Sequence, residues 1–93
     1  MRLYELTVIF PTEEDLYRPT KESISATLKQ AGAEIVKEDE LGERQLAYEI
    51  KGRMRGKYVL YVFNLEPDKI HAAEKVFKLE QNILKYLFVR ADV

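Results

Sequence analysis

Hydrophobic and polar residues alternate along the first ten positions of the chain. The apolar members of this pattern fall at every second position: Tyr4, Leu6, Val8 and Phe10. A two-residue period that is rich in aromatic and β-branched residues predicts a β-strand over Arg2–Phe10, with one face well buried. Pro11 ends this strand, because proline has no amide hydrogen to give to a sheet.

The apolar pattern then changes to a helical one. Its apolar positions form one narrow stripe at spacings of four and three: Ile24, Leu28 and Ala31. Pro19 lies ahead of this stripe, and an interior proline removes a helical hydrogen bond. We therefore expect a turn or short helical piece over residues 13–17, with Thr12 as its cap, and a main helix from Pro19 or Thr20 to Ala31.

Two more strands are predicted in the middle of the chain. The second strand starts near Ala33, bends at Gly42 and resumes its alternation at Arg44. The segment Lys51–Lys57 has two glycines among four bases, a composition that predicts a hairpin loop. The run that follows, Tyr58–Leu65, is almost entirely apolar, which is typical of a central strand.

A second helix and a last strand complete the pattern. The helix opens at Pro67-Asp68 and ends near Leu79, and the strand covers Ile83–Arg90. The order strand–helix–strand–strand–helix–strand predicts an α+β fold of the ferredoxin-like, split βαβ type. Such a fold has a four-stranded antiparallel sheet with two helices on one face, and right-handed crossovers put the first and third strands in the middle. We expect residues 1–93 to form a single domain.

This fold leaves one face of the sheet without helices. The predicted strands are apolar on both sides, so apolar side chains would lie on that open face. Apolar side chains gathered on a surface mark a place where another molecule binds. The first functional inference is therefore binding.

Catalysis has little support in the residue types. There is a single histidine, His71, and there is no cysteine, so no nucleophile–base pair stands out. Two acidic runs, Glu13–Asp15 and Glu38–Glu40, are better explained by a helix terminus and a solvated strand end than by a metal ion. We predict a protein that is not an enzyme and that needs no metal, cofactor or small-molecule substrate.

The chain shows no segment typical of a membrane protein. Its longest apolar run, Tyr58–Phe63, has six residues, whereas a membrane span needs about 20. The N-terminus also lacks the basic segment and the long apolar core of a signal peptide. We expect a cytoplasmic protein without a membrane partner.

The charge changes sign at mid-chain. Five acids stand against Lys37 in Glu34–Glu43, and five bases stand against Glu49 in Arg44–Lys57. Bases near aromatic residues suit contacts with RNA phosphates and bases, although a solvated hairpin tip would have the same composition. One further base stands at the start of the first predicted strand and another at the end of the last. With these two added, the candidate RNA-binding residues are Arg2, Arg44, Lys51, Arg53, Arg55, Lys57 and Arg90.

Several short motifs resemble one known family. The chain opens with the motif Met-Arg-x-Tyr-Glu. Its mid-chain signature consists of Gly42, Arg44, Gln45, Leu46, Ala47, Tyr48, Ile50 and Lys51. The Tyr-Val-Leu run of the third strand starts at Tyr58, and Asn-Ile-Leu-Lys starts at Asn82. In this order and spacing, the motifs resemble the bacterial small-subunit ribosomal protein six family over essentially the whole chain.

The resemblance implies a structural, ribosome-bound protein with the split βαβ fold. The family binds the central domain of the small-subunit rRNA together with small-subunit ribosomal protein eighteen, which docks on the sheet. For this chain, the residues expected to contact that partner are Tyr4, Leu60, Val62, Leu87 and Val89.

Other readings stay open at this level. A regulatory or small-ligand-binding module can share the same ferredoxin-like fold, since fold alone does not determine function. An enzyme of the dimeric α+β barrel type is a second alternative, weakened by the lone His71. An RNA-recognition motif is disfavoured, because Lys57 and Val59 occupy the positions where its stacking aromatics would lie.

Overall fold

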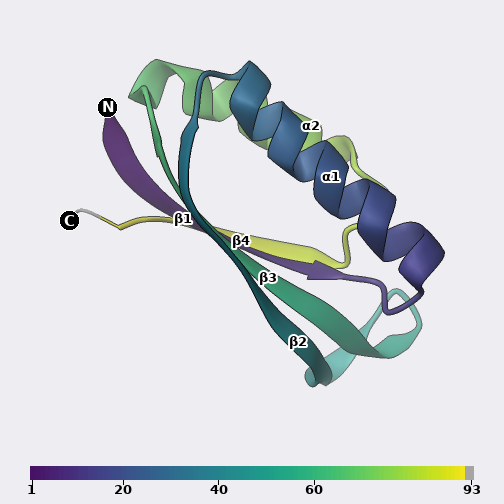
Figure 1. Ribbon diagram of the computed structural model, residues 1–93. Helices are drawn as coiled ribbons and strands as arrows, with labels where there is room; N and C mark the ends of the chain where they lie inside the picture. The colour runs from purple at the N-terminus through teal and green to yellow at the C-terminus, as the bar shows by residue number, and fades with distance from the viewer. Residues whose placement is uncertain (92–93) are drawn as a thin grey trace.

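The computed structural model describes residues 1–91, which form a four-stranded antiparallel sheet with two helices packed on one face (Figure 1). The strands are β1 (Arg2–Phe10), β2 (Glu34–Ile50), β3 (Arg53–Leu65) and β4 (Lys85–Arg90), and they lie in the order β2-β3-β1-β4. The helices are α1 (Glu14–Gln30) and α2 (Ile70–Leu79), the latter preceded by a 3-10 turn over Pro67–Lys69. The predicted element order and central strands are confirmed. Residues 92 and 93 of the predicted domain lie outside the described part.

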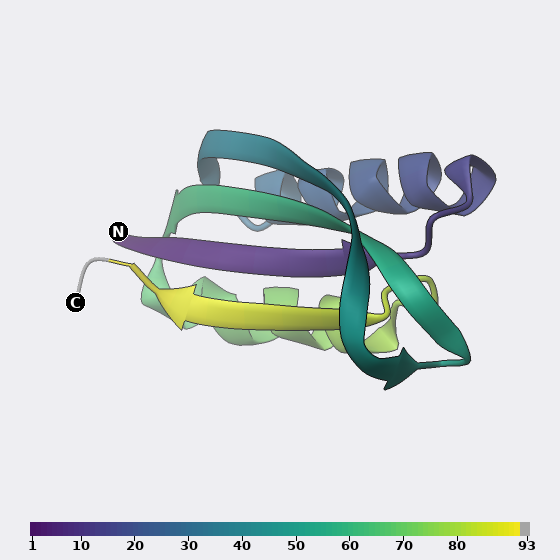
Figure 2. The same ribbon diagram turned by 90° about the horizontal axis from the view of Figure 1, so that it is seen from below.

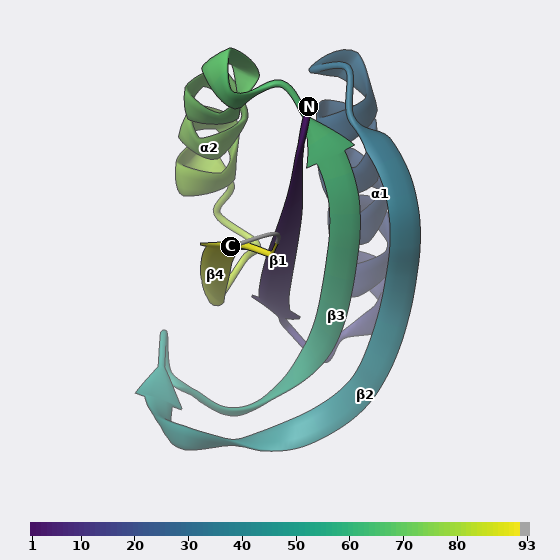
Figure 3. The same cartoon turned by 90° about the vertical axis from the view of Figure 1, so that its left-hand side faces the viewer.

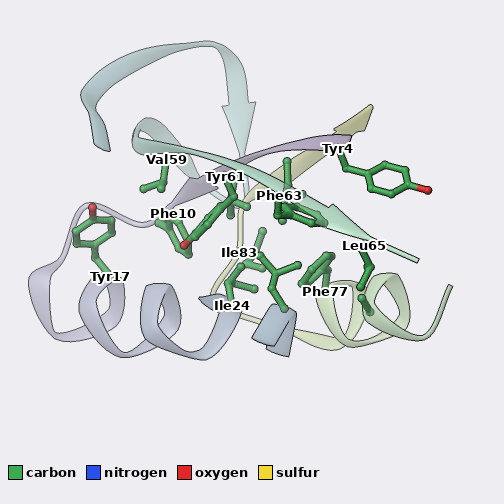
Figure 4. Close-up of a cluster of buried hydrophobic side chains, with 14 residues drawn as sticks. Tyr4, Phe10, Tyr17, Ile24, Val59, Tyr61, Phe63, Leu65, Phe77 and Ile83 are labelled. Carbon is green, nitrogen blue, oxygen red and sulfur yellow. The ribbon is translucent and has the colours of Figure 1, made fainter. Parts of the chain in front are cut away.

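The core lies between the sheet and the helices (Figure 4). The alternation predicted for β1 is confirmed, since every second side chain from Tyr4 to Phe10 is buried. On β3 the same alternation buries Val59, Tyr61, Phe63 and Leu65. The helices contribute Ile24, Leu28 and Phe77, all at most 1% exposed. Burial of these large apolar side chains is the main source of stability.

Helix α1 begins earlier than predicted, at Glu14, and includes Pro19. Its first turn stays helical because it is packed on the sheet: Tyr17 is buried, and its ring meets Phe10 edge to face at 5.5 Å. Tertiary packing of this kind outweighs the local cost of an interior proline. The cap was also misplaced, since Glu13 rather than Thr12 is the capping residue.

The loop predicted over Lys51–Lys57 is wrong, because only Lys51 and Gly52 form the turn. Both have positive φ, 50° and 76°, as in the type I′ turns that match the twist of paired strands. The bases from Arg53 onward therefore belong to β3. The bend predicted at Gly42 is confirmed by its φ of 94° and by a register shift between Glu40 and Gly42.

The far end of the β2–β3 hairpin, residues 43–57, is here called the arm. The arm bends across the end of the sheet and brings its turn close to the start of β4 (Figures 2 and 3). A small apolar cluster holds it there, formed by Ile9, Leu46 and Leu84. At the crossing, Gly56 leaves no room for a side chain, since a Cβ atom there would lie 2.5 Å from Ile9 Cγ2.

Candidate RNA and protein interfaces

The basic residues of the arm lie on both sides of β3. Three of them, at alternate positions, share the side that continues the helix-covered face, and each contacts a carboxylate. The pairs are Arg53 with Glu13, Arg55 Nε with Glu43 Oε2 at 2.7 Å, and Lys57 Nζ with Glu14 Oε2 at 2.7 Å. The basic segment predicted from the sequence is therefore largely neutralised by acids of the same chain.

Two of these acids belong to the start of α1. The hydrogen bond from Arg53 lowers the pKa of Glu13, and those from Lys57 and then Arg18 lower the pKa of Glu14. The carboxylates are nevertheless exposed to water. Exposed ion pairs contribute little to stability, so another anion can replace these carboxylates at small cost.

The opposite side of the arm carries cations next to aromatic rings. The Arg44 guanidinium lies 5.7 Å from the centre of the Tyr58 ring, and no carboxylate within residues 1–91 pairs with it. Lys85 donates a 2.8 Å hydrogen bond to the Tyr48 hydroxyl, which raises the pKa of Lys85. Cations beside aromatic faces are suited to RNA bases and phosphates. Lys85 and the two tyrosines were not predicted as site residues, although the alternation of β2, β3 and β4 gives their side.

Arg2 and Arg90 lie at the other end of the sheet. Arg2 faces Leu65 in the register of β1 and β3, and Arg90 faces Tyr4 in that of β1 and β4. Arg2 lies eight positions before Phe10, the end of β1 beside the arm, which is a distance of about 26 Å along the strand. The seven predicted RNA-binding residues thus fall into two separate groups.

Lys51 has a structural contact of its own. Its Nζ donates a 2.8 Å hydrogen bond to the carbonyl oxygen of Ile83 and a longer one, 3.4 Å, to that of Gln81. These bonds tie the turn of the arm to the loop before β4. Lys51 is therefore less available to RNA than its place in the sequence suggested.

The open face of the sheet carries four of the five predicted partner-binding residues. Leu60 and Val62 of β3 are partly buried, while Leu87 and Val89 of β4 are 60% and 42% exposed. The register places these residues in two rows, because Thr7 pairs with both leucines and Glu5 with both valines.

Tyr4 does not belong to this surface. Its side chain points to the helix-covered side, is 7% exposed and packs on the rings of Phe63 and Phe88. The prediction placed Tyr4 on the wrong face of the sheet, because neighbouring residues of a strand point to opposite sides. Glu5, the next residue, lies on the open face instead.

Other kinds of site find little support in the part of the chain that the structure describes. Within residues 1–91, no group of three or more His, Cys, Asp or Glu side chains is arranged to hold a metal ion. No helix in that range is long and apolar enough to cross a membrane. One cavity on the open face, of about 190 Å³, is lined by Thr7, Ile9, Tyr58, Lys85, Tyr86 and Leu87.

The fold and its surfaces define a class: a small α+β protein with apolar side chains on an open sheet face and a hairpin arm rich in bases. The family model described as Ribosomal protein S6 matches residues 3–90. Small ribosomal subunit protein bS6 of Treponema denticola is 45% identical over 92 residues, which cover 99% of each chain. The chain belongs to the Ribosomal protein S6 family.

Solved structures agree on the fold. 30S ribosomal protein S6 from Thermotoga maritima superimposes with a TM-score of 0.90 at 22% identity, covering 97% of this chain and 87% of that one. The C-terminal domain of the MgtC protein from Mycobacterium tuberculosis has a TM-score of 0.65 at 10% identity, with coverages of 99% and 89%. The second likeness shows that the same fold occurs in a differently named protein.

Family membership determines the general role. The chain is a structural protein of the small ribosomal subunit, located on the ribosome in the cytoplasm and associated with rRNA, and it is not an enzyme.

Proposed function

We propose that residues 1–93 act as one domain that binds the central domain of the small-subunit rRNA together with small-subunit ribosomal protein eighteen. The observation that carries this proposal is that β3 has two sides of opposite character. Alternate residues present bases on one side of its arm portion and apolar side chains on the open face of its sheet portion. Two such surfaces suit a protein that joins an RNA to a second protein.

The basic side is the proposed RNA contact. Arg53, Arg55 and Lys57 form ion pairs with exposed carboxylates, and an RNA phosphate carries the same charge as the carboxylate it would displace. Arg44 lies beside the Tyr58 ring and pairs with no carboxylate in the described range, so it is ready for a phosphate or a base. Arg2 and Arg90 would reach a second part of the RNA, and Lys51 would act mainly by holding the arm.

The open face is the proposed protein contact. Leu60 and Val62 of β3 and Leu87 and Val89 of β4 lie on this face, on either side of Thr7 and Glu5 of β1. Burying these apolar side chains removes apolar surface from water and favours association. Because the partner and the RNA would both contact β3, binding of one ligand is expected to strengthen binding of the other.

The test measures RNA affinity in the presence of the partner protein. The double variant Arg53→Gln with Arg55→Gln removes two phosphate contacts, and a matched control, Lys29→Gln with Lys75→Gln, removes the same charge from exposed helix positions. The double variant should weaken binding and reduce the slope of log affinity against log salt by about two. The control should leave that slope close to the wild-type value.

Two outcomes would count against the proposal. An unchanged slope in the double variant would remove the arm from the RNA site. Binding of central-domain RNA that is insensitive both to salt and to the partner would contradict the joint mechanism as a whole.

A small-ligand-binding module is the alternative function. Sites of that kind are cavities of about 300–1,000 Å³ with a few convergent polar groups. The open-face cavity is smaller, about 190 Å³. A hollow of about 360 Å³ beside the start of α1 falls within that range. Its Tyr17 and Lys21 side chains already donate hydrogen bonds to Glu40, so these polar groups are paired with each other.

A further inference from the structure

The centre of the open face carries one acidic side chain, Glu5. It lies on the central strand β1, directly between Val62 of β3 and Val89 of β4. The residue is partly buried. Within residues 1–91, no hydrogen bond or ion pair joins its carboxylate to another group.

The neighbouring cations on this face are engaged elsewhere. Lys37 lies in the same row beyond Val62, two strand spacings or about 9.6 Å from Glu5. Its Nζ pairs with Asp39 Oδ2 at 3.6 Å. Lys85, at the end of the face beside the arm, is bonded to Tyr48. Within residues 1–91, neither of these cations pairs with Glu5.

This arrangement has a consequence for whatever covers the face. A protein that buries Val62 and Val89 also takes the Glu5 carboxylate out of water. A buried charge without a partner carries a large desolvation penalty, whereas a buried charge with a well-placed counter-ion does not carry that full penalty. The covering molecule must therefore supply a positive charge at this position.

We infer that the protein partner presents an arginine side chain to Glu5, from within an apolar segment that covers Leu60, Val62, Leu87 and Val89. This inference rests on the proposed function, in which a protein covers the open face. Arginine is favoured over lysine because its planar group bonds a carboxylate with two parallel hydrogen bonds. The hydroxyl of Thr7, the next side chain on the same face of β1, offers an acceptor beside it.

A second copy of this chain fits the surface poorly. A symmetric dimer pairs each patch with itself, so a residue at the centre of the patch meets its own copy. Two Glu5 carboxylates would then approach one another, and like charges that lose water repel strongly. The charge at the centre favours a different, basic partner.

The experiment compares variants in binding to small-subunit ribosomal protein eighteen on central-domain RNA. Glu5→Gln keeps the shape of the side chain and removes its charge, and it should weaken the affinity for the partner by about tenfold or more. Glu5→Lys should weaken it further. Glu22→Gln, an equal charge change on exposed α1, serves as the control and should bind as the wild type does.

A second measurement separates recognition from folding. Because Glu5 has no partner within residues 1–91 of the free chain, Glu5→Gln should unfold at the same temperature as the wild type. A clear drop in that temperature would assign the carboxylate a structural role and overturn the inference.

Equal partner affinity of Glu5→Gln and the wild type would also overturn it, while leaving the proposed function in place. If the wild type itself fails to bind the partner on RNA, both fail. A dimer of this chain that involves the open face and is lost in Glu5→Lys would replace the basic partner with a second copy.

Discussion

The two faces of the sheet are built from the same strands, yet they do different work. On the helix-covered face, Leu6 and Val8 of β1 are fully buried, and so are Val59 and Tyr61 of β3. One position further along, Thr7 of β1 and Leu60 of β3 belong to the open face and keep contact with water. The comparison shows that adjacent residues of one strand have different roles: one packs in the core and stabilises the fold, and the next lies on the proposed binding face.

The two sides of the arm also differ: one side carries ion pairs and the other is packed against β1. On one side, Arg53, Arg55 and Lys57 pair with acids. On the other side, Gly56 and Leu46 pack closely against Ile9. The packed side fixes the position of the arm, and the charged side leaves its bonds open to exchange with an anion.

The largest difference between the faces should come from truncating one apolar residue on each. Phe77→Ala empties a site that is 1% exposed and lies beneath the covered face, and should lower the free energy of unfolding by about 3–5 kcal/mol. Leu87→Ala, on the open face, should change it by less than about 1 kcal/mol but weaken partner binding. Denaturant unfolding measures both values, and equal losses would contradict the division of roles.

A smaller loss is expected at the crossing between the arm and β1. A methyl group at Gly56 would lie 2.5 Å from Ile9 Cγ2 and 3.2 Å from the carbonyl oxygen of Phe10. Gly56→Ala should therefore destabilise the chain by about 1–3 kcal/mol through overpacking. Met54→Ala is the matched control, because Met54 lies on the same side of β3 and is 50% exposed. If thermal unfolding shows the two variants to be equally stable, the arm can move away from β1.

The smallest effect on stability is expected from the acids that pair with the arm. The double variant Glu13→Gln with Glu14→Gln should unfold at nearly the wild-type temperature at neutral pH, because these pairs are exposed. It should bind RNA more tightly, since it removes the carboxylates that compete with phosphate. Filter binding measures the affinity, with Glu22→Gln as the single-charge control, and weaker binding would show that the pairs orient the bases instead.

The same double variant has a pH signature of known sign. The folded chain lowers the pKa of both carboxyls below their ordinary value of 4.5. Their stabilising contribution is therefore present above pH 4.5 and is lost as the pH falls through the lowered values. The wild type should lose that contribution over this acidic range, whereas the variant has none to lose there.

Much of the fold could be predicted because its signals are local. The alternation of β1 gave the same bounds, Arg2–Phe10, that the structure has. A glycine followed by resumed alternation located the bend at Gly42. The order of elements was enough to give the topology, since only a few arrangements satisfy the handedness of the connections.

The wrong predictions concern features that are determined by contacts between residues far apart in the sequence. Lys57 and its partner Glu14 are 43 positions apart in the sequence, so composition alone suggested a free basic loop instead of a paired strand. Pro19 indicated a helix break that packing of Tyr17 overrides. The missing partner of Glu5 has no sequence signal either, because it becomes visible only when all neighbours on the open face are known.

The turn at Lys51-Gly52 and the alternation of β3 also limit which insertions and deletions the β2–β3 hairpin can accept. Adding or deleting one codon between Arg53 and Tyr58 would exchange the two sides of the arm, because strand side chains alternate with a period of two. Bases would then meet Ile9 and Leu84, and apolar groups would face the acids of α1. Inserting or deleting two residues keeps each residue type on its own side and moves only the tip. We therefore expect this hairpin to tolerate length changes of two residues better than changes of one.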